Sequence, residues 1–150
     1  ETNGTEYYLD KGYTYCDTVI PESEFYETNQ YKNFDGADWE ADDTQKEYLR
    51  QFVKLARENG SEVVFVTAPI ANISMELIVN YDDVHNELAA ISEELGVKYL
   101  DFNIVNMREN LFKLENFRDD AHLNDSGVKI ADKYYIEWLR NNTETFGNNN

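Results

Sequence analysis

Cysteine and basic residues are scarce in this sequence. With only one cysteine, Cys16, an internal disulfide and a cysteine-based zinc site are excluded within the 150 residues. Cys16 is a candidate thiol nucleophile, although a lone cysteine is more often a small core residue. There are 13 basic residues against 30 acidic ones, and the resulting net charge of −17 opposes binding to nucleic acid or to an anionic membrane surface. Neutral or cationic substrates are compatible with this charge.

Long apolar runs are missing as well. No stretch reaches the 18 or so apolar residues that a membrane-spanning helix needs. No signal peptide is visible either. Because the sequence starts at Glu1 without Met, we expect a processed or trimmed product, which leaves room for an upstream signal or anchor. The expected localisation is extracytoplasmic or secreted, in a bacterial cell envelope.

Aromatic residues are plentiful, with 11 Tyr and 8 Phe. A hydrophobic content of 41% is too high for a disordered chain, and the length suits one domain with a sizeable core. Residues 1–40 form a Tyr-rich acidic segment in which Tyr13–Ile20 is predicted to be a strand that Pro21 ends. The interleaved aromatics of this segment could line a carbohydrate site, but they are more typical of staples that tie an irregular segment to the core.

Residues 41–140 alternate between helical and strand patterns. Thr44 and Glu47 have the spacing of a capping box, and the apolar positions that follow predict a helix that ends at Gly60. The β-branched run 62–69 predicts a strand buried on both faces, as in a parallel sheet.

A second helix is predicted from Val84 to Leu95, then a strand over 97–102, a weaker helix over 104–114 and a final amphipathic helix around 130–139. Residues 141–150 are expected to form a disordered tail. This order predicts an α/β sandwich with a parallel sheet and right-handed crossovers. His85, on the second helix, is a candidate ligand, but an exposed helix histidine is the more typical case.

The stretch 117–127 carries the chemistry. Asp119 and His122 stand three residues apart just before the last helix, where a turn brings both side chains to one side. An imidazole can take a proton from a hydroxyl and return it to a leaving group, provided that an acceptor fixes its tautomer. Asp120 is expected to point elsewhere.

The longer string Asp119-x-x-His122-Leu123-Asn124-x-x-Gly127 closely resembles the last conserved block of the SGNH (GDSL-type) hydrolase superfamily. The pattern is most similar to the branch with the D-alanyl-lipoteichoic-acid protein family and related bacterial acyltransferases. The resemblance covers roughly residues 62–139. It implies a three-layer, flavodoxin-like sandwich in which Asp119 orients His122 and His122 is the general base. It also implies roles for Leu123 in packing, for Asn124 in capping and for Gly127 in close helix approach, with no cofactor and no metal.

Other blocks of that superfamily are missing. There is no Gly-Asp-Ser block and no Gly-x-Asn-Asp block for an oxyanion hole, and the two confident strands are fewer than the five that the resemblance implies. We therefore expect the N-terminal strands and the nucleophile to lie outside these residues. The candidate serines are Ser23, Ser61, Ser74, Ser92 and Ser126, of which Ser74 alone follows the carboxyl end of a strand.

Two functions remain open. One is a serine-type acyl-ester hydrolase or O-acyltransferase acting on a cell-envelope or polysaccharide substrate, with Asp119 and His122 in this chain. The other is a non-catalytic binding or accessory module of the same fold that lacks the nucleophile.

Overall fold

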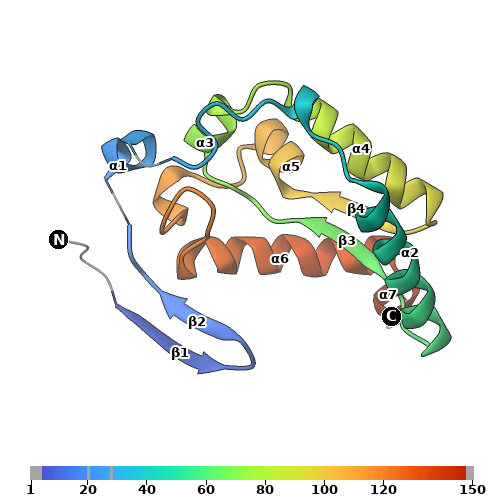
Figure 1. Ribbon diagram of the computed structural model, residues 1–150. Helices are drawn as coiled ribbons and strands as arrows, with labels where there is room; N and C mark the ends of the chain where they lie inside the picture. Colours follow the sequence, from blue (N-terminus) through green and yellow to red (C-terminus); the bar gives the residue numbers. More distant parts are fainter. Residues whose placement is uncertain (1–4, 20, 28, 148–150) are drawn as a thin grey trace.

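The structure, a computed structural model, describes residues 5–147 apart from residues 20 and 28. It is a mixed α/β fold, drawn in Figure 1. In chain order the elements are β1 (Glu6–Asp10), β2 (Tyr13–Cys16), α1 (Glu22–Glu27), η1 (Gly36–Asp38), α2 (Asp43–Glu58), β3 (Val64–Thr67), α3 (Asn72–Leu77), α4 (Tyr81–Glu94), β4 (Lys98–Asp101), α5 (Phe102–Glu109), η2 (Leu114–Asn116), α6 (Asp125–Asn142) and α7 (Glu144–Gly147).

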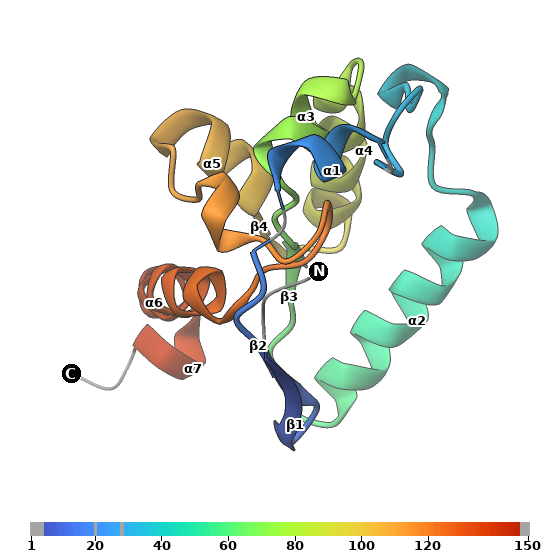
Figure 2. The ribbon, with the colours of Figure 1, turned by 90° about the vertical axis from the view of Figure 1, so that its left-hand side faces the viewer.

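β3 and β4 form a parallel pair, with Val64 opposite Lys98 and Thr67 opposite Asp101. The two strands that the sequence predicts are thus confirmed as neighbours. Figure 2 shows them between α5 and α6 on one side and α2 and α4 on the other. Among the described residues β3 pairs with no strand except β4, so the five-stranded sheet that the resemblance implies is not present there. Val66 is 41% exposed, and the prediction of burial on both faces is wrong at this residue.

The hydrophobic core lies between β4, α5 and α6. Phe112 is fully buried, and its ring packs against those of Phe102 and Phe117, with centroids 5.9 and 6.1 Å apart. Such tilted aromatic pairs add to the free energy gained by burial alone. The buried cluster consists of Ala71, Ile73, Leu100, Phe102, Val105, Phe112 and Phe117, and the inner side of α6 packs against it.

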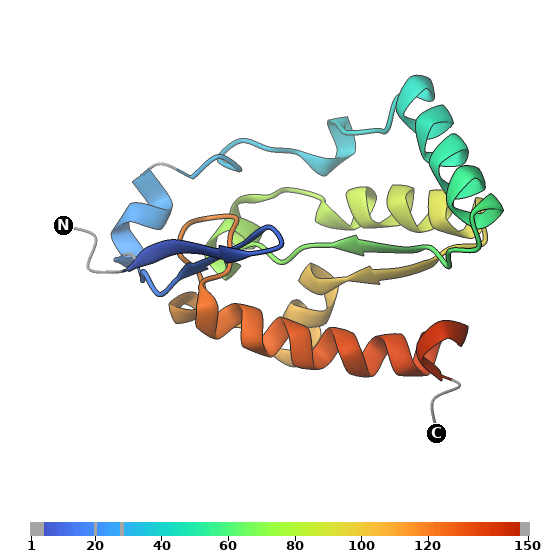
Figure 3. The same ribbon diagram turned by 90° about the horizontal axis from the view of Figure 1, so that it is seen from below.

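β1 and β2 form an antiparallel hairpin beside the start of α6 (Figure 1, Figure 3). Its turn residues Lys11 and Gly12 have φ of 50° and 86°, as in a type I′ turn. The sequence predicted only the strand Tyr13–Ile20; β2 ends at Cys16, and Ile20 lies outside the described residues. β1 escaped prediction because lysine is uncommon at positive φ. Cys16 is buried, as a core cysteine is.

α2 begins with a capping box, but not the predicted one. The amide of Gln45 donates to the Asp42 carboxylate at 2.9 Å, and the Asp42 amide donates to the Gln45 side chain at 3.0 Å. Thr44 and Glu47 have the same spacing, but Asp42 has the extended backbone that an N-cap needs, so the helix starts earlier.

The apolar stripe of α2 is only partly covered. Val53 is 2% exposed and Leu49 and Ala56 are partly buried. Tyr48 is 67% exposed and Phe52 is 60% exposed. Ion pairs to α4 hold the helix in place. Amphipathic spacing therefore predicted the helix correctly without predicting how much of its apolar face would be covered.

Two other helices differ from prediction at their ends. α4 begins at Tyr81, three residues before Val84. α5 spans Phe102–Glu109 rather than 104–114, because Asn110 adopts the left-handed conformation that ends a helix.

The last helix is longer than predicted. α6 starts after Asn124, whose side chain accepts the Gly127 amide at 3.1 Å, as the capping prediction required. It continues to Asn142, and α7 follows after Thr143, so residues 141–147 except Thr143 are helical rather than a disordered tail; residues 148–150 lie outside the described part. Across the described ranges, no helix is both long and apolar enough to cross a bilayer.

Candidate active site

The predicted catalytic pair lies on a tight loop between η2 and α6. Phe117 and Leu123 form an antiparallel bridge at its base, and the amide of Arg118 donates to the carbonyl of His122 at 2.9 Å. Phe117 is fully buried at one end, and Asn124 is 2% exposed at the other. The core and the start of α6 therefore fix both ends of the loop.

Asp119 holds His122 through its ring and its backbone. Nδ1 of His122 lies 2.8 and 3.0 Å from the two carboxylate oxygens of Asp119. The amides of His122 and Ala121 donate to Oδ1 at 2.7 and 2.9 Å. An aspartate that binds backbone amides two and three residues ahead closes a turn, which is why the spacing brings acid and base together. The predicted contact is confirmed, and it lies on the Nδ1 side.

The other face of the imidazole is open. The His122 side chain is 66% exposed and that of Asp119 is 37% exposed. Within the described part of the chain, no hydrogen bond engages Nε2 of His122. With Nδ1–H directed at the carboxylate, Nε2 of the neutral ring has its lone pair free toward solvent.

Opposing influences set the pKa of the Asp119 carboxyl. Partial burial raises it, but hydrogen bonds from the Ala121 amide and from the ring and amide of His122 outweigh burial and bring the pKa below its usual value. The carboxylate is therefore ionised at neutral pH, as the orienting partner of an imidazole must be.

The N-terminal segment closes over this loop. The Tyr13 hydroxyl donates to Asp125 at 3.0 Å, and Nδ2 of the Asn124 side chain donates to the Thr18 carbonyl at 3.2 Å. Arg118 lies 3.6 Å from Glu6 of β1. These contacts agree with the interpretation that the Tyr-rich segment is tied to the core of the protein.

Asp120 turns away from His122, as expected. Its carboxylate accepts the Gln30 amide at 2.8 Å and the Gln30 side chain at 3.1 Å. Its carbonyl accepts the Ala71 amide at 3.1 Å and the Ser74 hydroxyl at 2.9 Å.

None of the candidate serines forms a hydrogen bond with His122 in the described structure. Ser74 is fully buried and binds the backbone, Ser92 donates to a carbonyl within α4, and Ser126 donates to Asn124 at 2.6 Å. Ser61 precedes β3, at the end opposite to its carboxyl edge, and Ser23 is exposed on α1. Ser74 follows the carboxyl end of β3, but its hydroxyl is closed off from any substrate.

His85 is not the exposed helix residue that the sequence favoured. Its Nδ1 lies 2.9 Å from Oδ2 of Asp101, with side chains 29% and 1% exposed. The Tyr81 hydroxyl donates to both oxygens of Asp101 at 3.0 Å, and the Tyr99 hydroxyl donates at 3.2 Å. Burial beside this carboxylate raises the pKa of both phenols, so they stay protonated.

The sequence did point to Asp101 of the Asp101–His85 pair, because Asp101 lies at the end of a predicted strand. Functional side chains of α/β folds gather at that edge of the sheet. The partner of Asp101 on α4 was not readable, because acidic residues surround His85 in the sequence. Asp101 also caps α5 by accepting the Asn103 amide at 2.9 Å. The second pair thus has a clear structural role.

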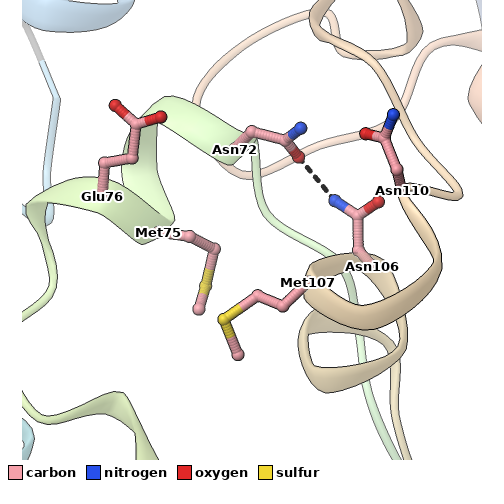
Figure 4. A pocket seen from close by; sticks show the side chains of 6 residues that line it. All are labelled: Asn72, Met75, Glu76, Asn106, Met107 and Asn110. Carbon is pink, nitrogen blue, oxygen red and sulfur yellow. Dashed lines mark hydrogen bonds between the residues drawn. The ribbon is translucent and has the colours of Figure 1, made fainter.

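A surface pocket of about 490 Å³ lies between α3 and α5 (Figure 4). Figure 4 shows Met75 and Met107 facing each other, and the Asn106 amide donates to Asn72. Both side chains also bind the backbone of Phe112: Asn72 donates to its carbonyl, and Asn106 accepts its backbone amide. The lining residues are Asn72, Met75, Glu76, Asn106, Met107 and Asn110, none of which belongs to the loop with His122.

Within the described ranges, no three histidine, cysteine or carboxylate side chains converge as metal ligands would. The Asp119–His122 pair is an arrangement that can accept and return a proton at Nε2. No known family model matches the chain, and no curated protein is significantly similar to it.

Proposed function

We propose that this chain carries the acid and base of a serine-type acyl-ester hydrolase or O-acyltransferase. The observation that supports the proposal most is the contact of His122 Nδ1 with both oxygens of Asp119, which leaves Nε2 exposed. Only an imidazole with one nitrogen fixed and the other free can work as an oriented general base.

In this mechanism a serine hydroxyl loses its proton to Nε2 of His122 as its oxygen attacks the ester carbonyl. His122 then returns the proton to the leaving alcohol, and an acyl-serine forms. Water or an acceptor hydroxyl then gives a proton to Nε2 as its oxygen attacks the acyl group. Nε2 passes that proton to the leaving serine oxygen, which restores the serine hydroxyl and the neutral imidazole. The ionised Asp119 stabilises the imidazolium in both steps.

The fold proposed is the SGNH sandwich, with β3 and β4 as two of its parallel strands. Supporting this, the segment that follows the carboxyl end of β3 contacts the loop with His122, because the Ala71 amide donates to the Asp120 carbonyl. Ligands of open α/β sheets bind at that edge. The nucleophilic serine and the oxyanion donors are proposed to come from outside the described residues.

The substrate proposed is an acyl ester on a cell-envelope or other polysaccharide, outside the cytoplasm. A net charge of −17 favours a neutral or cationic polymer over an anionic one.

The test uses the protein as its cells produce it. A fluorophosphonate probe should label a serine, and His122→Ala should abolish the labelling, whereas the control His85→Gln should retain it. Labelling unaffected by His122→Ala would remove the general base from the proposal. The isolated 150-residue chain should show neither labelling nor turnover of short-chain aryl esters, with or without His122→Ala. Turnover lost in both Ser74→Ala and His122→Ala would instead show a complete site within these residues.

The second candidate, a non-catalytic binding or accessory module, is favoured by one observation. Each described serine lacks a contact with His122, and Ser74, Ser92 and Ser126 are all committed to structural hydrogen bonds. This candidate predicts no probe labelling even in the protein as its cells produce it.

A further inference from the structure

The residue next to Asp119 is held by two distant parts of the chain. Asp120 receives three backbone or side-chain donors besides the buried Ser74 hydroxyl: the Gln30 amide and side chain on its carboxylate, and the Ala71 amide on its carbonyl. Gln30 is 90 residues away and Ser74 is 46 residues away. The side chain and the carbonyl of Asp120 are therefore both fixed, within the turn that Asp119 closes and that presents His122.

The Ser74 hydroxyl has one proton to give, and the structure shows where it goes. Asn29 Nδ2 donates to Ser74 Oγ at 2.8 Å, so Oγ is an acceptor from that side. The Ser74 proton is then directed to the Asp120 carbonyl at 2.9 Å. Ser74 is fully buried and Asn29 is 7% exposed. Water therefore cannot readily replace either partner, and losing one of these hydrogen bonds would leave a buried polar group unpaired.

The segment that bears Ser74 has its own anchor. Asn103, 2% exposed, accepts the Ile70 amide at 2.9 Å and donates to the Ala68 carbonyl at 3.3 Å. A series of hydrogen bonds thus leads from the start of α5, through the turn after β3, to the Asp120 carbonyl. Polar series of this kind rigidify what they connect when every member is satisfied.

We infer that Ser74 and Asn29 are positioning residues for His122: together they fix the Asp120 carbonyl, so that the Asp119 carboxylate meets Nδ1 and Nε2 points outward. The relevance to catalysis rests on the proposed function, but the geometric effect does not. Neither residue touches a reacting atom, and neither is part of the string 119–127 that pointed to His122.

Two variants test this. Ser74→Ala removes the donor to Asp120. Asn29→Asp is nearly isosteric but replaces the amide donor with a carboxylate, which competes with the Asp120 carbonyl for the Ser74 proton. In both, NMR should show a smaller fraction of the Nδ1–H tautomer of His122 and an upward shift of the Asp119 carboxyl pKa. Amide exchange at Ala121 and His122 should accelerate about tenfold, the factor expected for one lost hydrogen bond.

Ser92→Ala is the matched control. Ser92 is also buried, at 5% exposed, and also donates to a backbone carbonyl, at 2.8 Å, but it lies on α4. Its substitution should leave the His122 tautomer and the Asp119 titration unchanged. His85 serves as an internal reference in every spectrum, because its Nδ1 also faces a carboxylate.

If Asn29→Asp keeps the protected amides of β3 and β4 while the His122 tautomer and the Asp119 titration stay as in the parent, the positioning role is wrong. Because Asn29→Asp preserves volume, the test stands even where Ser74→Ala fails to fold. The proposed function fails separately: NMR changes of the expected kind, together with probe labelling that His122→Ala leaves intact, would retain the positioning role and reject the catalytic one.

Discussion

His122 presents Nδ1 to both carboxylate oxygens of Asp119 while its own backbone amide binds one of the same oxygens at 2.7 Å. The aspartate therefore sets the position of the backbone and the orientation of the ring at once. A side chain that rotated away from the ring would also lose the turn. This double use makes the pair more rigid than the 66% exposure of His122 would suggest.

Asp119→Asn should reverse the tautomer of His122. An amide at residue 119 can still accept the backbone amides through its oxygen, but its nitrogen can donate to Nδ1, which favours the Nε2–H form. Long-range proton–nitrogen NMR on the neutral ring measures this directly. His85, whose carboxylate partner is unchanged, should keep its tautomer in the same sample. An Nδ1–H form of His122 that persists in Asp119→Asn would show that Asp119 does not fix the ring.

The stabilisation due to Asp119 should depend on pH. The folded pKa of this carboxyl lies below the usual value of 3.8, so its contribution to the free energy of unfolding is fully present above that value and is lost as the pH falls through the folded pKa. Asp119→Asn keeps the hydrogen bonds to the backbone amides but loses the charge. Because the Asp119 side chain is 37% exposed and solvent screens its interactions, the substitution should cost about 1 kcal/mol or less at neutral pH. The cost should shrink toward zero in the acid range below 3.8. Urea unfolding at a series of pH values gives both numbers, and a cost that is constant with pH would contradict the prediction.

The sequence predicted the parts of the site that are local. Asp119 and His122 were predicted as a pair because their spacing suits a turn and because the string around them resembles the SGNH block. Asn124 was predicted as a cap because it precedes a periodic apolar stripe. β3 could be predicted because a β-branched run that ends in a proline is typical of a parallel strand.

The contacts that position the loop could not be read in this way. Asn29 meets Ser74 across 45 residues, and Gln30 meets Asp120 across 90. No periodicity or spacing marks such partners, since each is an ordinary polar residue until the chain has folded. For the same reason the sequence showed only that Ser74 follows the carboxyl end of a strand, whereas in the structure its hydroxyl donates to the Asp120 carbonyl.

Phe112 and Phe52 both lie at apolar positions of the sequence, but they differ in burial. Phe112 is fully buried against Phe102 and Phe117, so Phe112→Ala should lower the free energy of unfolding by about 3–5 kcal/mol. Phe52 lies on the apolar stripe of α2 but is 60% exposed, and Phe52→Ala should cost about 1 kcal/mol or less. Denaturant unfolding of the two variants side by side measures the difference. A large cost for Phe52→Ala would mean that the exposed face of α2 is covered in solution.

Gly127 allows the first turn of α6 to approach the preceding segment closely. A Cβ at this position would lie 2.3 Å from the Asn116 carbonyl oxygen and 2.7 Å from a methyl group of Leu123. That carbonyl also accepts the Asn124 amide at 2.9 Å, so it cannot move away without weakening the start of α6.

Gly127→Ala should therefore destabilise the protein by about 1–3 kcal/mol, as overpacking does, although alanine gains about 1 kcal/mol over glycine in helix propensity. Lys133→Ala, at an exposed position of the same helix, should stay within about 0.5 kcal/mol of the parent. Because Leu123 is the neighbour of His122, the displaced loop should also weaken the Nδ1 contact with Asp119, visible as a smaller Nδ1–H fraction by NMR. If Gly127→Ala were as stable as the parent and kept the His122 tautomer, the close approach of α6 would play no part in holding the pair.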